Sequence, residues 1–159
     1  MTSPHKTLQF SLTEFNQIHK EMEELYHTMA LSLNLSDSAF TILYALYEQG
    51  DGCLQKDICH EFCLSKQTVN SSIKKLEQHG YLLLEQGQGR DKRIIVTAKG
   101  SQLLEEKIRP VFEMEQQAFA QMTPEENSML LRLNRKYCDM LRAQINAWQP
   151  CFDNAGTHE

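Results

Sequence analysis

The chain has 159 residues, of which 41% are hydrophobic and 23% are charged, and its formal net charge at pH 7 is −5. This composition is typical of a soluble globular protein, and the length suits one domain with helical extensions and a real core. No apolar run approaches the roughly 18 residues that cross a bilayer, and the first ten residues lack the basic start and apolar stretch of a signal peptide. We therefore expect a cytoplasmic protein with no membrane segment.

Two helices are predicted in the first third of the chain. Ser11 and Glu14 resemble a capping box, and apolar residues then recur at three- and four-residue spacing, which predicts a long amphipathic helix over residues 10–33. Ser36 is a good N-cap for a second helix, which ends at Gly50.

The middle of the chain predicts two further short helices and a hairpin. A third helix is expected at about residues 55–62, and a fourth has Ser65 as its cap and Gly80 as its stop. Two short runs, 81–85 and 93–96, are predicted to be strands of a hairpin, joined by a loop that contains two glycines. Because this loop is longer than a two-residue turn, we expect it to project.

Two long helices are predicted in the last third of the chain. Thr97 caps the first of them, and Pro110 lies inside it, where it removes one backbone donor and should bend the helix. The sequence Thr-Pro-Glu-Glu at residues 123–126 is a strong start for the last helix, with proline in the first turn and glutamate at the box position. This helix reaches Trp148, and residues 149–159 are expected to be a disordered tail.

These elements predict a mainly α fold with a small β-hairpin wing, that is, a winged helix-turn-helix flanked by long dimerisation helices. We expect residues 36–97 to form the DNA-binding domain and residues 10–33 and 98–148 to form a helical dimerisation region. Helices with such an apolar stripe need a partner surface, and a second subunit can supply it. The alternative is that these helices cover the domain within one chain.

Charge is unevenly distributed along the chain. Residues 65–100 contain seven basic and three acidic residues, a net charge of +4, so the remaining residues sum to −9. Affinity for phosphate depends on the local patch and the counterions that it releases, not on the whole-chain charge. The acidic total therefore does not exclude a nucleic-acid partner.

A polar helix followed by a basic hairpin suits a DNA duplex, with the helix in a major groove and the hairpin at a minor groove. Gln67 and Asn70 are the best candidates to read bases, because a terminal amide can pair with adenine through two hydrogen bonds. Hydroxyls and lysines suit phosphate oxygens. The simpler alternatives are a solvated helix face and a hairpin made soluble by charge. The residues expected to contact double-stranded DNA are Ser65, Lys66, Gln67, Thr68, Asn70, Ser71, Lys74, Arg90, Asp91, Lys92 and Arg93.

The five cysteines are an odd number in a chain without an export signal, which favours reduced thiols over a disulfide framework. Cys59 and Cys63 are four residues apart, so a redox switch is conceivable. A zinc site usually needs a second, distant pair of ligands, and no metal or cofactor is predicted. Packing of both cysteines as small core residues is the simpler alternative.

Several segments of the chain resemble the MarR family of bacterial transcription regulators. They are residues 55–58, the run L-S-K-Q-T-V-N at 64–70, the run K-K-L-E-Q-H-G-Y at 74–81 and the wing R-D-K-R-I-I-V-T-A-K-G at 90–100. The Asp-x-Arg wing followed by a Thr-x-x-Gly helix start is the most specific of these features. The likeness covers about residues 10–148.

This resemblance implies an obligate homodimer on palindromic operators, usually acting as a repressor of nearby genes. Many relatives are released from DNA by small aromatic or phenolic anions or by thiol oxidation. The resemblance also implies that Asp91 holds Arg93 in position. The chain departs from the family where Ser71 replaces a residue that is often basic and Leu54 replaces a capping threonine. Residues that could line an effector pocket, but also fit a core, are Tyr26, His27, Tyr44 and Phe112.

Two other classes of function are compatible with parts of the sequence. A winged-helix module that binds protein, with the wing only as a lid, is the main alternative. An enzyme is disfavoured, because the sequence has no Gly-rich phosphate loop, no Ser/His/Asp arrangement and no paired carboxylates at a plausible cleft.

Overall fold

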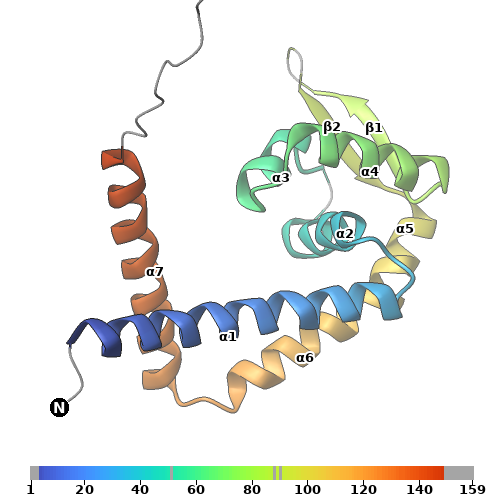
Figure 1. Ribbon diagram of the computed structural model, residues 1–159. Helices are drawn as coiled ribbons and strands as arrows, with labels where there is room; N and C mark the ends of the chain where they lie inside the picture. The colour runs from blue at the N-terminus through green and yellow to red at the C-terminus, as the bar shows by residue number, and fades with distance from the viewer. Residues whose placement is uncertain (1–3, 51, 88, 90, 149–159) are drawn as a thin grey trace, which may run out of the picture. The chain divides into compact units, whose positions relative to one another are not determined.

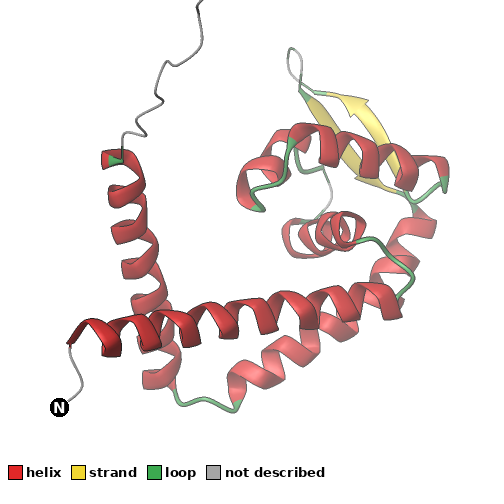
Figure 2. Ribbon diagram, viewed as in Figure 1, coloured by secondary structure: helices red, strands yellow, loops and turns green. Residues whose placement is uncertain are grey.

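The computed structural model describes residues 4–50, 52–87, 89 and 91–148 (Figure 1). The predicted fold class is confirmed, since helices predominate in these described ranges and an antiparallel hairpin follows the fourth helix (Figure 2). The chain divides into two compact units, Met1–Phe112 and Glu113–Glu159.

The elements in order are α1 (Pro4–Ser32), α2 (Asp37–Gln49), α3 (Gln55–Glu61), α4 (Lys66–Gln78), β1 (Leu82–Gln86), β2 (Lys92–Val96), α5 (Ala98–Leu103), a π-helical turn (Leu104–Ile108), α6 (Arg109–Ala120) and α7 (Pro124–Ala147).

The predicted start of the first helix is wrong, because α1 begins seven residues before Ser11, at Pro4. A proline fits the first turn of a helix, where its missing N–H would have no partner. Inside the helix, Thr13 Oγ1 donates to the carbonyl of Gln9, one turn earlier, over 2.9 Å. Hydroxyl residues can hydrogen-bond within a helix as well as cap one, so a capping-box pattern alone does not fix where a helix begins.

The predicted caps of α2 and α4 are confirmed. The Ser36 hydroxyl accepts from the backbone N–H of Ala39, and the Ser65 hydroxyl accepts from that of Thr68 over 3.0 Å. Each bond satisfies one of the N–H groups that lack a partner at a helix N-terminus. Helix α2 ends at Gly50, as predicted, where the backbone has a φ of 83°.

The core of the winged region lies where α2, α3 and α4 meet the hairpin. Ser38 and Ser72 join α2 to α4 through a 2.7 Å hydrogen bond between their hydroxyls. Fully burying an aliphatic side chain stabilises a fold by roughly 1.5–3 kcal/mol, so the buried aliphatic residues are a main source of stability where these short elements meet. The largest fully buried side chains here are Ile42, Leu43, Leu46, Ile58, Ile73, Leu82 and Ile94.

The hairpin is antiparallel, with Leu82 opposite Val96, and each strand differs by one residue from its predicted bounds. The segment before α3 also pairs with β2. The N–H of Gly52 donates to the carbonyl of Ile94, and the N–H of Ile94 donates to the carbonyl of Cys53, both over 3.0 Å. This pairing holds the beginning of α3 beside the wing.

The turn from β2 into α5 depends on close contact with the end of α4. Thr97 Oγ1 donates to the carbonyl of Gly80 over 2.7 Å and accepts from the N–H of Gly100 over 3.0 Å. A Cβ atom placed on Gly100 would lie 2.1 Å from the carbonyl oxygen of Tyr81. The Thr-x-x-Gly pattern therefore has a steric reason, because only glycine leaves room for that oxygen.

The helix predicted after Thr97 is a run of three helical segments. A π-helical turn, Leu104–Ile108, separates α5 from α6 and is closed by the N–H of Arg109 on the carbonyl of Leu104. Proline cannot donate a backbone hydrogen bond, and its ring crowds the carbonyl four residues earlier in a regular helix. The wider turn ends at Ile108, two residues before Pro110, so the structure accommodates this proline by local widening of the helix.

Helix α7 begins as predicted. The Thr123 hydroxyl accepts from the N–H of Glu126, and the Glu126 carboxylate accepts from the N–H of Thr123 over 2.8 Å, which completes a capping box. None of the α7 residues is buried. The predicted tail, residues 149–159, lies outside the described residues.

Among the described residues, no single helix is both long enough and apolar enough to cross a membrane. The segments Gln9–Ser32 and Asp37–Gln49 meet these criteria only together, as a pair bent by 89°.

Candidate nucleic-acid interface

The outer face of α4 carries a groove lined only by polar side chains. Its five lining residues recur at helical spacing, so they share one face of the helix. Three of them can donate or accept hydrogen bonds without carrying a charge, and two are lysines. The lining residues of this groove, which we call the α4 groove, are Lys66, Gln67, Asn70, Ser71 and Lys74.

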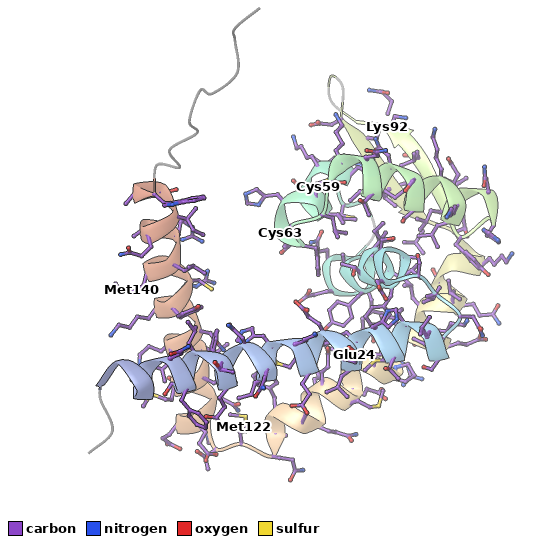
Figure 3. The ribbon with its side chains drawn as sticks, viewed as in Figure 1. Glu24, Cys59, Cys63, Lys92, Met122 and Met140 are labelled. Carbon is purple, nitrogen blue, oxygen red and sulfur yellow. The ribbon has the colours of Figure 1, made fainter. Side chains whose placement is uncertain are left out.

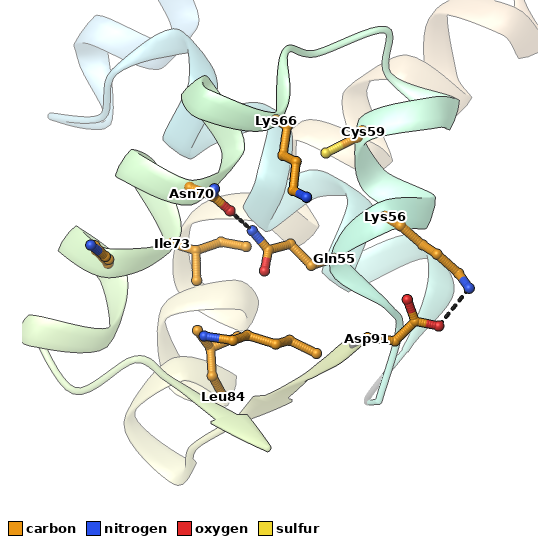
Figure 4. A pocket seen from close by; sticks show the side chains of 10 residues that line it. Gln55, Lys56, Cys59, Lys66, Asn70, Ile73, Leu84 and Asp91 are labelled. Carbon is orange, nitrogen blue, oxygen red and sulfur yellow. Dashed lines mark hydrogen bonds and ion pairs between the residues drawn. The ribbon is translucent and has the colours of Figure 1, made fainter. Parts of the chain in front are cut away.

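A second groove of about 520 Å³ lies between α3, α4 and the wing (Figure 4). Lys66, Asn70 and Lys74 line both grooves and therefore lie between them. Four lysines line the second groove, together with one carboxylate, so its potential attracts polyanions. The lining residues of this wing groove are Gln55, Lys56, Cys59, Lys66, Asn70, Ile73, Lys74, Leu84, Asp91 and Lys92.

An ion pair ties α3 to the wing. Lys56 Nζ lies 2.6 Å from Asp91 Oδ2. The hydrogen bond to Asp91, together with the charge of that carboxylate, raises the pKa of Lys56 above its ordinary value. The implied pairing of Asp91 with Arg93 therefore needs correction, because the backbone pairing of residues 52–54 with β2 brings Lys56 to this carboxylate.

Arg93 lies elsewhere on the hairpin. It faces Glu85 across the ladder, and its Cδ would lie 3.4 Å from a Cβ atom placed on Gly52. The side chain is exposed, and its methylenes lie beside the backbone that leads into α3. Gly52, with a φ of 87°, thus provides both the turn and the space for this arginine.

A hydrogen bond also joins α3 to the candidate base-reading residue on α4. Gln55 Nε2 donates to Asn70 Oδ1 (Figure 4). The sequence pattern indicated Asn70 but assigned no role to Gln55 or Lys56. The available signal was the presence of two long polar residues at the start of the short helix that precedes the reading helix.

The hydroxyl residues predicted to bind phosphate have local roles as well. The hydroxyls of Ser65 and Thr68 lie 2.7 Å apart at the helix cap, and Ser71 Oγ donates to the carbonyl of Thr68 over 3.0 Å. Of these three residues, Ser71 lines the α4 groove. Of the wing residues, Asp91 and Lys92 line the wing groove, and Arg90 lies outside the described residues.

The two cysteines considered for redox chemistry have different surroundings. Cys59 is half-buried on α3 and lines the wing groove, whereas Cys63 follows that helix and is exposed (Figure 3). The packing alternative is therefore wrong for Cys63, which has a φ of 52°. Both thiols are free. Within the described ranges, no group of three or more His, Cys, Asp or Glu residues is arranged to hold a metal ion.

The residues considered for an effector pocket form an aromatic cluster in the first unit. The ring centroids of Tyr44 and Phe112 lie 5.9 Å apart, and those of Tyr26 and Phe40 lie 6.5 Å apart. His27 Nδ1 lies 2.8 Å from Asp37 Oδ1. These contacts tie α1, α2 and the end of the first unit together.

Comparison with known proteins shows which family this geometry resembles. The model of the MarR family matches residues 33–94. A MarR family regulator from Neisseria meningitidis, NMB1585, is 19% identical with a TM-score of 0.77, over 86% of this chain and 97% of that one. The Staphylococcus aureus MepR–DNA complex is 26% identical with a TM-score of 0.64, over 81% and 96%. Bordetella bronchiseptica BpsR is 21% identical with a TM-score of 0.60, over 79% and 98%. No curated protein matches the sequence.

The resemblance to the MarR family is thus confirmed. The family match over residues 33–94 and the fold make the chain similar to the winged helix-turn-helix transcription regulators of this family.

Proposed function

We propose that the chain is a sequence-specific DNA-binding repressor that acts in the cytoplasm as a homodimer on a palindromic operator. The observation that carries this proposal is the α4 groove. Two amides and two lysines share the exposed face of the helix that a winged helix-turn-helix inserts into the major groove. The similarity to MepR, whose structure was solved with DNA, supports the same use of this face.

The roles of the groove residues follow from their chemistry. Gln67 and Asn70 offer amide groups to base edges, while Lys66 and Lys74 at the two ends of the groove suit the phosphates on either side. Lys92 extends the positive charge onto the wing. We assign no catalytic role to any of these residues.

The exposed apolar residues of α1 and α7 support the homodimer. In a single chain, Leu25 is 66% exposed, and Leu141 on α7 is 44% exposed. Stripes of this kind are removed from water when two copies associate. A two-fold dimer would present two copies of α4 to successive major grooves.

We further propose that a small aromatic or phenolic anion releases the protein from DNA. The support is by analogy: BpsR is described as regulated in its DNA binding by 6-hydroxynicotinic acid, and an S. aureus MarR was solved with salicylate and kanamycin. Thiol oxidation is a second route to release, because Cys59 lines the groove that DNA would cover. Unchanged operator affinity after peroxide treatment would exclude the thiol route.

Selection of bound duplexes from a random-sequence pool by the purified protein tests the proposal. We expect a two-fold-symmetric site whose half-sites are separated by one helical turn. If no sequence is enriched, and if the binding of duplex DNA does not weaken as salt rises, the alternative of a protein-interaction module would be favoured instead.

A further inference from the structure

The amide of Asn70 is engaged by a side chain of α3 in this structure. Its Oδ1 accepts from Gln55 Nε2, a side chain of α3 that is fifteen residues away in the sequence (Figure 4). Gln55 is half-buried at the first position of α3, whereas Asn70 is exposed on α4. The half-buried Gln55 therefore orients the amide of the exposed Asn70.

The direction of this hydrogen bond fits the charges around it. Four lysines line the wing groove that both amides share. The oxygen of an amide dipole is favoured beside ammonium groups. Gln55 can thus leave its oxygen toward the lysines and direct its NH2 to Asn70.

The hydrogen bond changes what Asn70 offers to a base. A free asparagine has one acceptor oxygen and two N–H donors, and it pairs with adenine by accepting from N6 and donating to N7. With Oδ1 held by Gln55, the outward group of Asn70 is its NH2. Guanine offers two acceptors in the major groove, N7 and O6, and has no donor there.

We propose that Gln55 is a positioning residue that sets the base preference of Asn70, favouring guanine over adenine at the base pair that Asn70 faces. This inference rests on the proposed DNA-binding function and deepens it. Gln55 acts through the orientation of a neighbouring amide.

Two substitutions of Gln55 separate an effect on orientation from a simple weakening of binding. Gln55→Ala frees Asn70 to rotate, so adenine regains its two-bond partner. Gln55→Glu can only accept, so Asn70 must turn its NH2 toward the carboxylate and expose Oδ1. That oxygen favours bases with a major-groove donor, adenine or cytosine.

The experiment is a random-sequence selection with the full-length wild type and both variants, repeated in an Asn70→Ala background. We expect the guanine-to-adenine ratio at one base pair of each half-site to fall by about fivefold or more in both variants, the scale of one discriminating base contact. In the Asn70→Ala background, the Gln55 substitutions should leave the ratio unchanged. Gln78→Glu, at the other end of α4, controls for the added negative charge, and thermal melting checks that each variant is folded.

The outcomes distinguish this inference from the function on which it rests. If the wild type enriches no sequence, the proposed function fails. If the wild type enriches a site and the Gln55 variants bind it more weakly with the same base pattern, the inference is overturned, because Gln55 then only contacts phosphate or supports the fold. A shift that persists without Asn70 also overturns it, because Gln55 then reads the base itself.

Discussion

At the scale of single residues, glycine is required at position 100 because the carbonyl oxygen of Tyr81 occupies the space of a side chain. Gly100→Ala would force its Cβ against the carbonyl oxygen of Tyr81. We expect a loss of about 1–3 kcal/mol in the free energy of unfolding from overpacking, despite the better helix propensity of alanine. Urea denaturation at a fixed protein concentration measures this loss. Ser101→Ala, on the next, exposed residue, should change stability by under about 0.5 kcal/mol, and equal effects of the two substitutions would contradict the steric explanation.

Replacement of Arg93 on the wing should weaken DNA binding without changing the stability of the fold. Its side chain is exposed and lies outside the buried core. We predict that Arg93→Ala weakens operator binding by roughly 1–3 kcal/mol, the usual scale for a specific contact, with an unchanged melting temperature. A gel-shift titration measures the affinity, and unchanged binding would refute this role for the arginine.

Features of single residues were predictable where their cause is local. Ser36, Ser65 and Thr97 were assigned as caps correctly, because a cap depends on a hydroxyl and the next three residues. Gln55 and Lys56 were missed, because their partners lie fifteen and thirty-five residues away. A sequence pattern carries no information on which of several polar residues will meet in space.

At the scale of elements, the position of the wing depends on its connection to α3. The Lys56–Asp91 pair and the backbone pairing of residues 52–54 with β2 join the two. Because the pKa of Lys56 is raised in the folded protein, the ion pair stabilises the folded state fully at pH values below the ordinary lysine pKa. This stabilisation is lost as the pH rises through the raised pKa.

This connection predicts a titration that can be observed directly. The Lys56 side chain, followed by NMR of carbon-labelled lysine, should titrate at higher pH than a free lysine. In Asp91→Asn its midpoint should return toward the ordinary value, since the substitution removes both the hydrogen bond to a carboxylate and the charge. The exposed Lys75 serves as the internal control. Identical Lys56 midpoints in the two proteins would show that the pair does not form in solution.

Elements with a strong periodic pattern were predicted better than their boundaries. The bounds of α2, α3 and α4 agree with the prediction to within one or two residues. The prediction failed at Ser11, where a capping-box pattern lies inside a helix, and near Pro110, where a π-helical turn replaces a simple bend. Both failures occur where a local signal competes with a helix that continues through it.

At the scale of the whole molecule, the proposed homodimer is the arrangement that would cover the exposed stripes. Leu133 and Leu141 lie on one side of α7, two helical turns apart, and are 50% and 44% exposed. We predict that Leu133→Glu with Leu141→Glu shifts the protein from dimer to monomer in sedimentation equilibrium, because each buried charge would lack a partner.

The matched control for this prediction places the same charge on the opposite face of the helix. Arg135 lies about 200° around α7 from Leu133, so Arg135→Glu should leave the dimer intact. Dissociation by Arg135→Glu alone, or a wild type that sediments as a monomer, would contradict the proposed dimer.

The salt dependence of operator binding tests the central claim most directly. Fluorescence anisotropy with the selected duplex, over a range of salt concentrations, gives the slope of log affinity against log salt. For the wild type we predict a steep negative slope, which Lys74→Gln makes shallower by about 0.9 for each phosphate that is no longer neutralised, or about 1.8 for a dimer. Binding that is independent of salt, or a slope that is the same with and without Lys74, would contradict the assignment of this face to DNA.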